Sequence, residues 1–323
     1  MDRIFIKPQY DKIAQQYKEK LVQDDIWTDI MMSLDLILND IAPVDNNYSD
    51  YVLWLKNNLE RLLIMHPSEF KEVIKFLDTT YSCDTDWNGW LSGDTTHFGV
   101  RVSNALHYDE VRKKVLPEYV KQIGIKTCVY CNMQYALTVT RKRGKALAFY
   151  ELDHAWPKSR YPYLTLSFYN LQPCCGPCNR HKSALEAKSP FYIYWDELQP
   201  QPKPVVVFSI KNKSLVEYML THRHNILEIE NTVEDGFSEL CKKLHISQLY
   251  KLQTDEAEEM IWRAKIYNNA YFNQLSITYG KSFMNTRTNL FRILYGVYAA
   301  EESVFTRPMT KFKLDIAKQL HII

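Results

Sequence analysis

The chain has 323 residues, a length that suggests two or three domains. Its hydrophobic content of 46% is ordinary and sufficient to form hydrophobic cores. No apolar run approaches the roughly eighteen residues of a membrane span, and the N-terminus lacks the apolar core of a signal peptide. These features argue against a membrane protein and predict a cytoplasmic one, in which thiols stay reduced.

The net charge of +2 conceals an asymmetry. Residues 121–190 carry eleven Lys/Arg and three Asp/Glu, a local charge of +8, so the remainder carries −6. A basic segment of this kind suits a phosphate backbone as ligand. Charge alone would favour an ordinary solvated face, and only its coincidence with the motifs described below favours nucleic acid.

Residues 1–112 are predicted to form an N-terminal helical region. Apolar residues recur at helical spacing over 26–41 and 51–65, and Pro67 opens a further helix. The stretch 82–94, rich in Trp, Gly and Asp, is predicted to be an irregular connection.

Residues 113–199 are predicted to form a central module. A helix over 111–122, kinked at Pro117, leads into it. The apolar period then changes to two, which predicts strands at 135–140 and 146–154 joined by a basic turn, and a helix follows Cys178.

Residues 200–323 are predicted to form a C-terminal helical region. Proline-rich residues 200–204 indicate a linker, and 205–210 one short strand. Asp255 and Glu258 resemble a capping box. Three helices are expected after the strand: 255–280, 288–300 and 310–320.

Two C-x-x-C pairs fit a tetrahedral zinc site formed by Cys128, Cys131, Cys175 and Cys178. The odd total of seven cysteines also favours a metal over a disulfide framework. The alternative is a set of four buried thiols. Cys174 could replace Cys175 as a ligand, although Cys175 forms the tighter knuckle with Cys178.

Asp153 and His154 end the second predicted strand, just before Pro157. Neighbours on a strand point to opposite faces, so the two side chains converge on one substrate only where the strand ends. Imidazole suits a general base at neutral pH, and a carboxylate suits Mg²⁺. An isolated Asp-His pair is weak evidence for a catalytic site, because most histidines in a fold are structural.

Asn179 directly follows the last zinc ligand, so its position is fixed by the metal, and its amide oxygen could join Asp153 on a catalytic ion. Lys182 lies one helical turn further and is expected to touch a substrate phosphate. Asn170 could brace the loop that carries His154, or be an ordinary turn residue. Candidates for nucleic-acid contacts are Arg141, Lys142, Arg143, Lys145, Lys158, Arg160, Arg180 and Lys182.

The combined pattern C-x-x-C, D-H-x-x-P and N-L-x-P-x-C-x-x-C-N-x-x-K, over residues 126–185, resembles the HNH endonuclease family with a zinc-bound ββα-metal core. The resemblance implies that His154 is the general base and Asp153 a ligand of Mg²⁺ or Mn²⁺. It makes Asn170 the central Asn of the motif. Asn179 takes the third position, where many members have His, a variation that suits Mg²⁺.

The C-terminal RPMTKFKLDIAKQL is similar to bacterial HNH proteins encoded near ATPases, which include the nuclease subunits of Septu-type and retron-linked phage-defence systems. This similarity implies a role in antiviral defence and an ATPase or other regulatory protein as partner. The chain itself has no P-loop.

The sequence thus predicts an α+β, mostly α fold with a central ββα-metal HNH module between two helical regions. The expected function is metal-dependent hydrolysis of phosphodiester bonds, with DNA as the expected substrate. Two alternatives stay open. One is a zinc-stapled module that binds nucleic acid without cutting it, and the other is an assembly subunit whose helical flanks do the main work.

Overall fold

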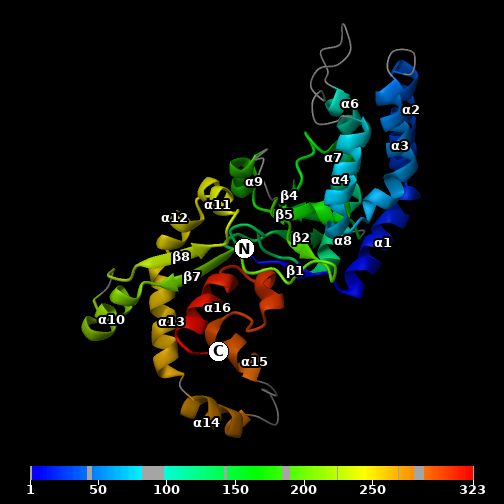
Figure 1. The fold of residues 1–323 in the computed structure, drawn as a ribbon. Coiled ribbons are helices and arrows are strands. Elements are labelled where there is room, and N and C mark those ends of the chain that lie inside the picture. The colour runs from blue at the N-terminus through cyan, green and yellow to red at the C-terminus, as the bar shows by residue number, and fades with distance from the viewer. Residues whose placement is uncertain are drawn as a thin grey trace.

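The computed structural model describes residues 2–41, 46–81, 98–141, 144–183, 190–223, 225–267, 269–279 and 287–322. Small two-stranded sheets lie among many helices, which confirms the predicted α+β, mostly α class. The molecule is elongated, with the N-terminal helices at one end, the central strands in the middle and the C-terminal helices at the other end (Figure 1).

The helices predicted over 26–41, over 51–65 and from Pro67 are confirmed as α2 (Asp25–Ile41), α3 (Asn46–Leu63) and α4 (Pro67–Tyr81). This region also contains α1 (Pro8–Val22) and α6 (Phe98–Ala105). Each turns an apolar stripe inward, such as Leu55, Leu59 and Leu62 of α3, all fully buried or nearly so. The predicted irregular stretch 82–94 lies outside the described residues.

The single kinked helix predicted over 111–122 is instead two helices, α7 (Tyr108–Lys114) and α8 (Leu116–Ile123). The chain breaks at Val115, and Pro117 occupies the first turn of α8. Proline has no N–H to donate, so it is best accommodated at the start of a new helix.

The strand predicted over 146–154 is wrong as one unit, because it divides at Tyr150. The first half, β3 (Ala146–Phe149), forms the expected antiparallel hairpin with β2 (Leu137–Thr140). The second half, β4 (Glu151–His154), pairs instead with β5 (Leu171–Cys174). Helix α9 (Gly176–Lys182) follows β5 directly, so β4, β5 and α9 form one strand–strand–helix unit. Two short 3₁₀ turns, η1 (Pro162–Leu164) and η2 (Phe168–Asn170), lie between β4 and β5.

The N-terminal strand β1 (Ile4–Phe5) pairs in parallel with β6 (Tyr194–Trp195), which connects the N-terminus to the middle of the chain. The predicted strand at 205–210 is confirmed as β7 (Val206–Ile210). Its antiparallel partner β8 (Ile229–Val233) was not predicted. The helical elements of this region are α10 (Asn212–Thr221), α11 (Ser238–Lys243), α12 (Ile246–Lys251), α13 (Thr254–Ile266), α14 (Asn269–Tyr279), α15 (Arg287–Tyr295), η3 (Glu301–Thr306) and α16 (Thr310–Gln319).

The long helix expected over 255–280 is wrong, because α13 ends at Ile266 and α14 begins separately at Asn269. The capping box is wrong too. Gln253 is the N-cap of α13, and no side chain there bonds a backbone N–H. The helix predicted at 310–320 is confirmed as α16, and that at 288–300 is shorter than expected.

Tyrosine dominates the interior: nine of the twelve largest fully buried side chains are Tyr. Several of their hydroxyls join distant segments, because a buried O–H needs a partner. Tyr17 donates to the carbonyl of Leu166 at 3.0 Å. Tyr108, which is buried but not among these nine, donates to the carbonyl of Leu152 at 3.0 Å. The aromatic residues therefore serve mainly to pack the core. Among the described residues, no helix has the length and apolar character that crossing a bilayer requires.

Candidate metal centre and neighbouring polar site

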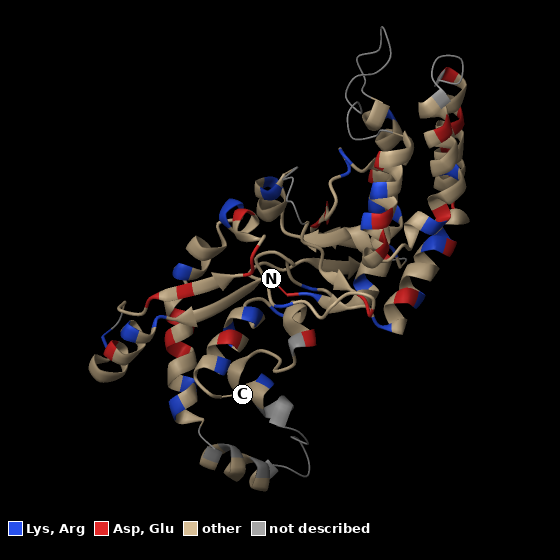
Figure 2. Ribbon diagram, in the orientation of Figure 1, with Lys and Arg blue, Asp and Glu red and all other residues tan. Residues whose placement is uncertain are grey.

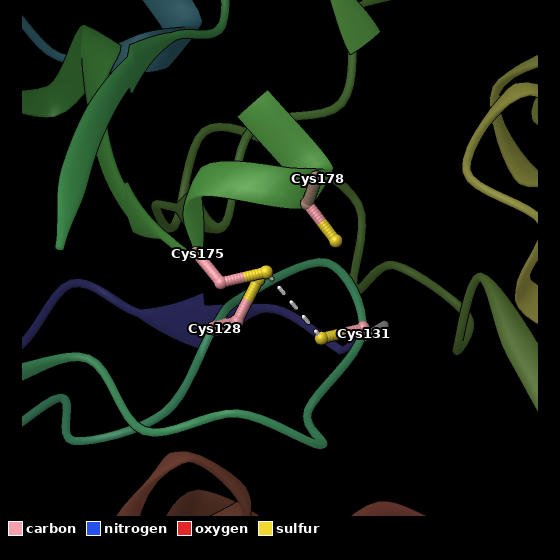
Figure 3. A group of neighbouring side chains, drawn as sticks. All are labelled: Cys128, Cys131, Cys175 and Cys178. Atoms are coloured by element: carbon pink, nitrogen blue, oxygen red, sulfur yellow. Dashed lines mark hydrogen bonds between the residues drawn. The ribbon is translucent and has the colours of Figure 1, made fainter. Parts of the chain in front are cut away.

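The four predicted cysteines converge, with their sulfur atoms turned toward one another (Figure 3). All four are buried, and their sulfurs lie within 4.8 Å of one another. The Sγ atoms of Cys131 and Cys175 are 3.9 Å apart. A tetrahedral zinc site with Zn–S bonds of about 2.3 Å needs sulfurs about 3.8 Å apart. The group could therefore bind a metal ion such as zinc.

The local backbone explains this convergence. Asn132 has φ of 52° and donates its backbone N–H to the carbonyl of Cys128 at 2.9 Å, which closes the first knuckle. The N–H of Met133 points at the Cys131 sulfur, 3.5 Å away. Cys175 is the extended N-cap of α9, which brings Cys178 round to the same side in the first turn.

The thiols favour a cation on electrostatic grounds. Burial raises the pKa of Cys128 well above its usual range, whereas a hydrogen bond from Cys128 lowers the pKa of Cys175. Neighbouring thiolates repel, so the four sulfurs cannot all ionise unaided. A divalent cation at their centre would remove that repulsion.

Cys174 lies outside the cluster. Its thiol is 3.6 Å from the carbonyl oxygen of Glu151, across the β4–β5 ladder. Successive residues of an extended chain point to opposite sides, and Cys175 is extended, so Cys175 and not Cys174 faces the other three sulfurs. The preference for Cys175 over Cys174 is confirmed.

Asp153 is buried near the end of β4, and one oxygen of its carboxylate has two side-chain partners. Its Oδ2 accepts a hydrogen bond from the Tyr130 hydroxyl and lies 2.9 Å from the ammonium of Lys182. Burial raises the pKa of Asp153 even though Lys182 opposes that rise. Lys182 is buried too, so in this conformation its ammonium is not accessible to a substrate phosphate.

His154 is also buried, and one ring nitrogen is committed. Its Nε2 lies 2.9 Å from the carbonyl oxygen of Thr165. A carbonyl can only accept, so Nε2 carries the proton and the lone pair is on Nδ1. Burial lowers the pKa of His154 to about 3, and nearby Lys158 contributes, so the ring is neutral. The Tyr108 ring packs on it, with centroids 4.8 Å apart.

Asn170 holds the loop between β4 and β5 in place. Its Oδ1 accepts from the N–H of Trp156 at 2.8 Å. Its Nδ2 donates to the carbonyls of Leu164 at 3.0 Å and Trp156 at 3.2 Å. The fully buried amide thus ties both sides of the loop next to His154.

Asn179 lies in the first turn of α9, half-buried, and its backbone carbonyl accepts from Ser183 at 3.0 Å. The four cysteines are the one group of three or more His, Cys, Asp or Glu ligands found within the described ranges. Asp153 and Asn179 do not belong to that group. The donor types, one carboxylate and one amide oxygen, suit Mg²⁺.

The eight candidate nucleic-acid contacts divide into four sets, one of which is the buried Lys182. Arg141, Lys145, Lys158 and Arg180 are exposed. Arg160 is half-buried beside the Tyr161 ring, 5.7 Å from its centroid. Lys142 and Arg143 lie outside the described residues.

Three further cations lie near the site and were missed. Arg112 of α7 helps to lower the pKa of His154 and pairs with Glu151. Lys242 and Lys243 of α11 are exposed, and α11 packs against α9, where Figure 2 shows basic residues on both helices. The sequence signal for these two was the adjacent Lys pair, without any sign that α11 meets α9.

The chain matches no protein-family model, no curated protein and no solved structure.

Proposed function

We propose that the protein is a metal-dependent nuclease of the HNH type, which hydrolyses phosphodiester bonds at the β4–β5–α9 unit. The observation that carries this proposal is the setting of His154. Its Nε2–H is held by the Thr165 carbonyl, so Nδ1 carries the lone pair that would take a proton from water once the site opens to solvent. Asn170 fixes the loop that provides that carbonyl.

The other residues have separate roles in this proposal. Cys128, Cys131, Cys175 and Cys178 hold a structural Zn²⁺ that joins the first knuckle to the start of α9. Asp153 and Asn179 would hold Mg²⁺ or Mn²⁺, which when bound supplies charge stabilisation to the phosphate. Exposed Arg141, Lys145, Lys158 and Arg180 would contact the nucleic-acid backbone.

DNA is the proposed substrate, and antiviral defence with an ATPase or other regulatory partner is the proposed setting. Both rest on the motif and on the C-terminal sequence RPMTKFKLDIAKQL, most of which forms α16. Contacts with backbone phosphates position a nucleic acid without reading its bases, so little sequence preference is expected.

A second candidate function is a zinc-stapled module that binds nucleic acid or a partner without cutting. The closed state of the site favours it, since Asp153 is 8% and His154 7% exposed. One oxygen of the Asp153 carboxylate, Oδ2, is also occupied internally, by Tyr130 and Lys182.

Cleavage assays separate the two candidates. The zinc-loaded protein is mixed with plasmid, linear duplex, single-stranded DNA and RNA, with Mg²⁺ or Mn²⁺ and with EDTA. The nuclease proposal predicts metal-dependent cleavage of at least one DNA substrate. Binding that persists in EDTA, with no cleavage under any condition, supports the binding module instead.

A further inference from the structure

We propose that Lys182 is an internal substitute for the catalytic cation: its ammonium occupies the Asp153 carboxylate in the closed form and must leave before a divalent metal binds there. This inference rests on the metal role proposed for Asp153. It adds a built-in restraint to that site.

The ammonium of Lys182 contacts two oxygen atoms of β4, as a bound metal cation would. It is 2.9 Å from Asp153 Oδ2 and donates to the backbone carbonyl of His154 at 3.0 Å. Its side chain is only 5% exposed, so water shares little of this coordination. Both acceptors belong to β4, and the donor comes from α9, so the contact closes the unit across its two elements.

A divalent cation on the same carboxylate would face a buried ammonium within a few ångströms. Two like charges at that distance, with little water between them, repel strongly. Lys182 and the metal are therefore competitors for Asp153, and the affinity for the metal includes the work of displacing Lys182.

The backbone next to Lys182 is strained in the closed form. Ser183, the C-cap of α9, has φ of 51° and ψ of −150°, a combination that suits glycine and not serine. Rearrangement of the helix end at Ser183 would relieve this strain and withdraw Lys182 from β4.

Tyr130, the other partner of Asp153 Oδ2, is held in place by hydrogen bonds of its own. Tyr130 donates to the carboxylate and accepts from Gln172 Nε2 at 3.0 Å. The same Gln172 donates to the Phe191 carbonyl at 2.9 Å and accepts from the Ile193 N–H at 2.8 Å. Because this network is independent of Lys182, the carboxylate stays positioned when the ammonium leaves.

The test is the Mn²⁺ affinity of the zinc-loaded full chain, measured by electron paramagnetic resonance. Lys182→Met keeps the length of the side chain and removes its charge. It should bind Mn²⁺ about tenfold more tightly than the wild type, because a like charge is removed from the site. The double variant Asp153→Asn/Lys182→Met should lose this gain. Equal or weaker binding by Lys182→Met, or a gain that survives in the double variant, overturns the proposal.

Ser183→Gly provides a second test that leaves the buried ion pair intact. It relieves the strain of the closed form, so it should weaken Mn²⁺ binding relative to the wild type. Unchanged or tighter binding contradicts the proposal, even if Lys182→Met does not fold. If the Mn²⁺ shifts occur as expected but no nucleic acid is cut, the restraint stands and the proposed nuclease function fails.

Discussion

The hydroxyl of Tyr250 lies 2.6 Å from the carbonyl oxygen of Cys131, which connects α12 directly to the first metal knuckle. The next residue, Asn132, adds three contacts to the C-terminal region: its Oδ1 accepts from Lys311 N, its carbonyl from Met309 N, and its Nδ2 donates to the Val304 carbonyl. The knuckle is therefore also the docking point of the C-terminal region.

Tyr250→Phe should lower the free energy of unfolding by about 1–3 kcal/mol, because the Cys131 carbonyl loses its donor in a buried place. Urea unfolding of the zinc-loaded protein measures this. Tyr135→Phe is the matched control, since Tyr135 is 58% exposed and its hydroxyl can bond to water. Equal effects of the two substitutions would show that the contact contributes nothing specific.

Cys175→Ser should lose the bound metal, and Cys174→Ser should keep it. Only Cys175 belongs to the sulfur group, and its neighbour faces the Glu151 carbonyl. Metal analysis of the purified variants by mass spectrometry is the measurement, with about one zinc per chain expected for the wild type and Cys174→Ser. Zinc retained by Cys175→Ser but lost by Cys174→Ser would reverse the ligand assignment.

Asn170→Asp should destabilise the protein at least as much as Asn170→Ala, although the Asp and Asn side chains have nearly the same shape. The Asn170 Nδ2 donates to two carbonyls, and a carboxylate oxygen in its place would face both without a proton. Losses of about 3–5 kcal/mol are expected for Asn170→Asp, of the order seen for an unpaired buried charge. Thermal unfolding of the two variants measures these losses. A mild effect of Asn170→Asp would indicate that the Asn170 amide does not hold the loop between β4 and β5 in place.

Cys241 predicts a pH effect. Burial raises the pKa of this thiol to about 11, above the value of about 8.5 for an unfolded chain. Its contribution to stability is thus complete below about pH 8.5 and is lost as the pH rises through the folded pKa. Between about pH 8 and pH 11, the stability advantage of the wild type over Cys241→Ala should shrink by about 1–3 kcal/mol. A constant difference in urea unfolding would contradict this.

The parts of the site that the sequence predicts are those set by local spacing. Each C-x-x-C closes a knuckle within four residues, so each pair of cysteines follows from local spacing. The contact between Lys182 and Asp153 depends on how α9 packs on β4. Helical spacing predicts which residues lie on the same face of α9 as Lys182, but it does not predict whether that face is buried. The burial of Lys182 could therefore not be predicted from the sequence pattern.

The errors in the strands have the same origin. At Tyr150 the chain changes its pairing partner from β2 to β5, although the alternating pattern continues without a break. Strand β8 has only two apolar residues, Ile229 and Val233, and depends on its ladder with β7. Both features belong to pairing between segments distant in sequence.

The most direct test of the central claim is the single-turnover rate of DNA cleavage by the zinc-loaded His154→Ala variant with Mn²⁺. His222→Ala is the control, because His222 is exposed and stacks on Trp262 of α13, with ring centroids 5.5 Å apart. Loss of the general base predicts a rate at least about 100-fold below that of the wild type, with His222→Ala unchanged. A wild-type rate in His154→Ala would contradict the account.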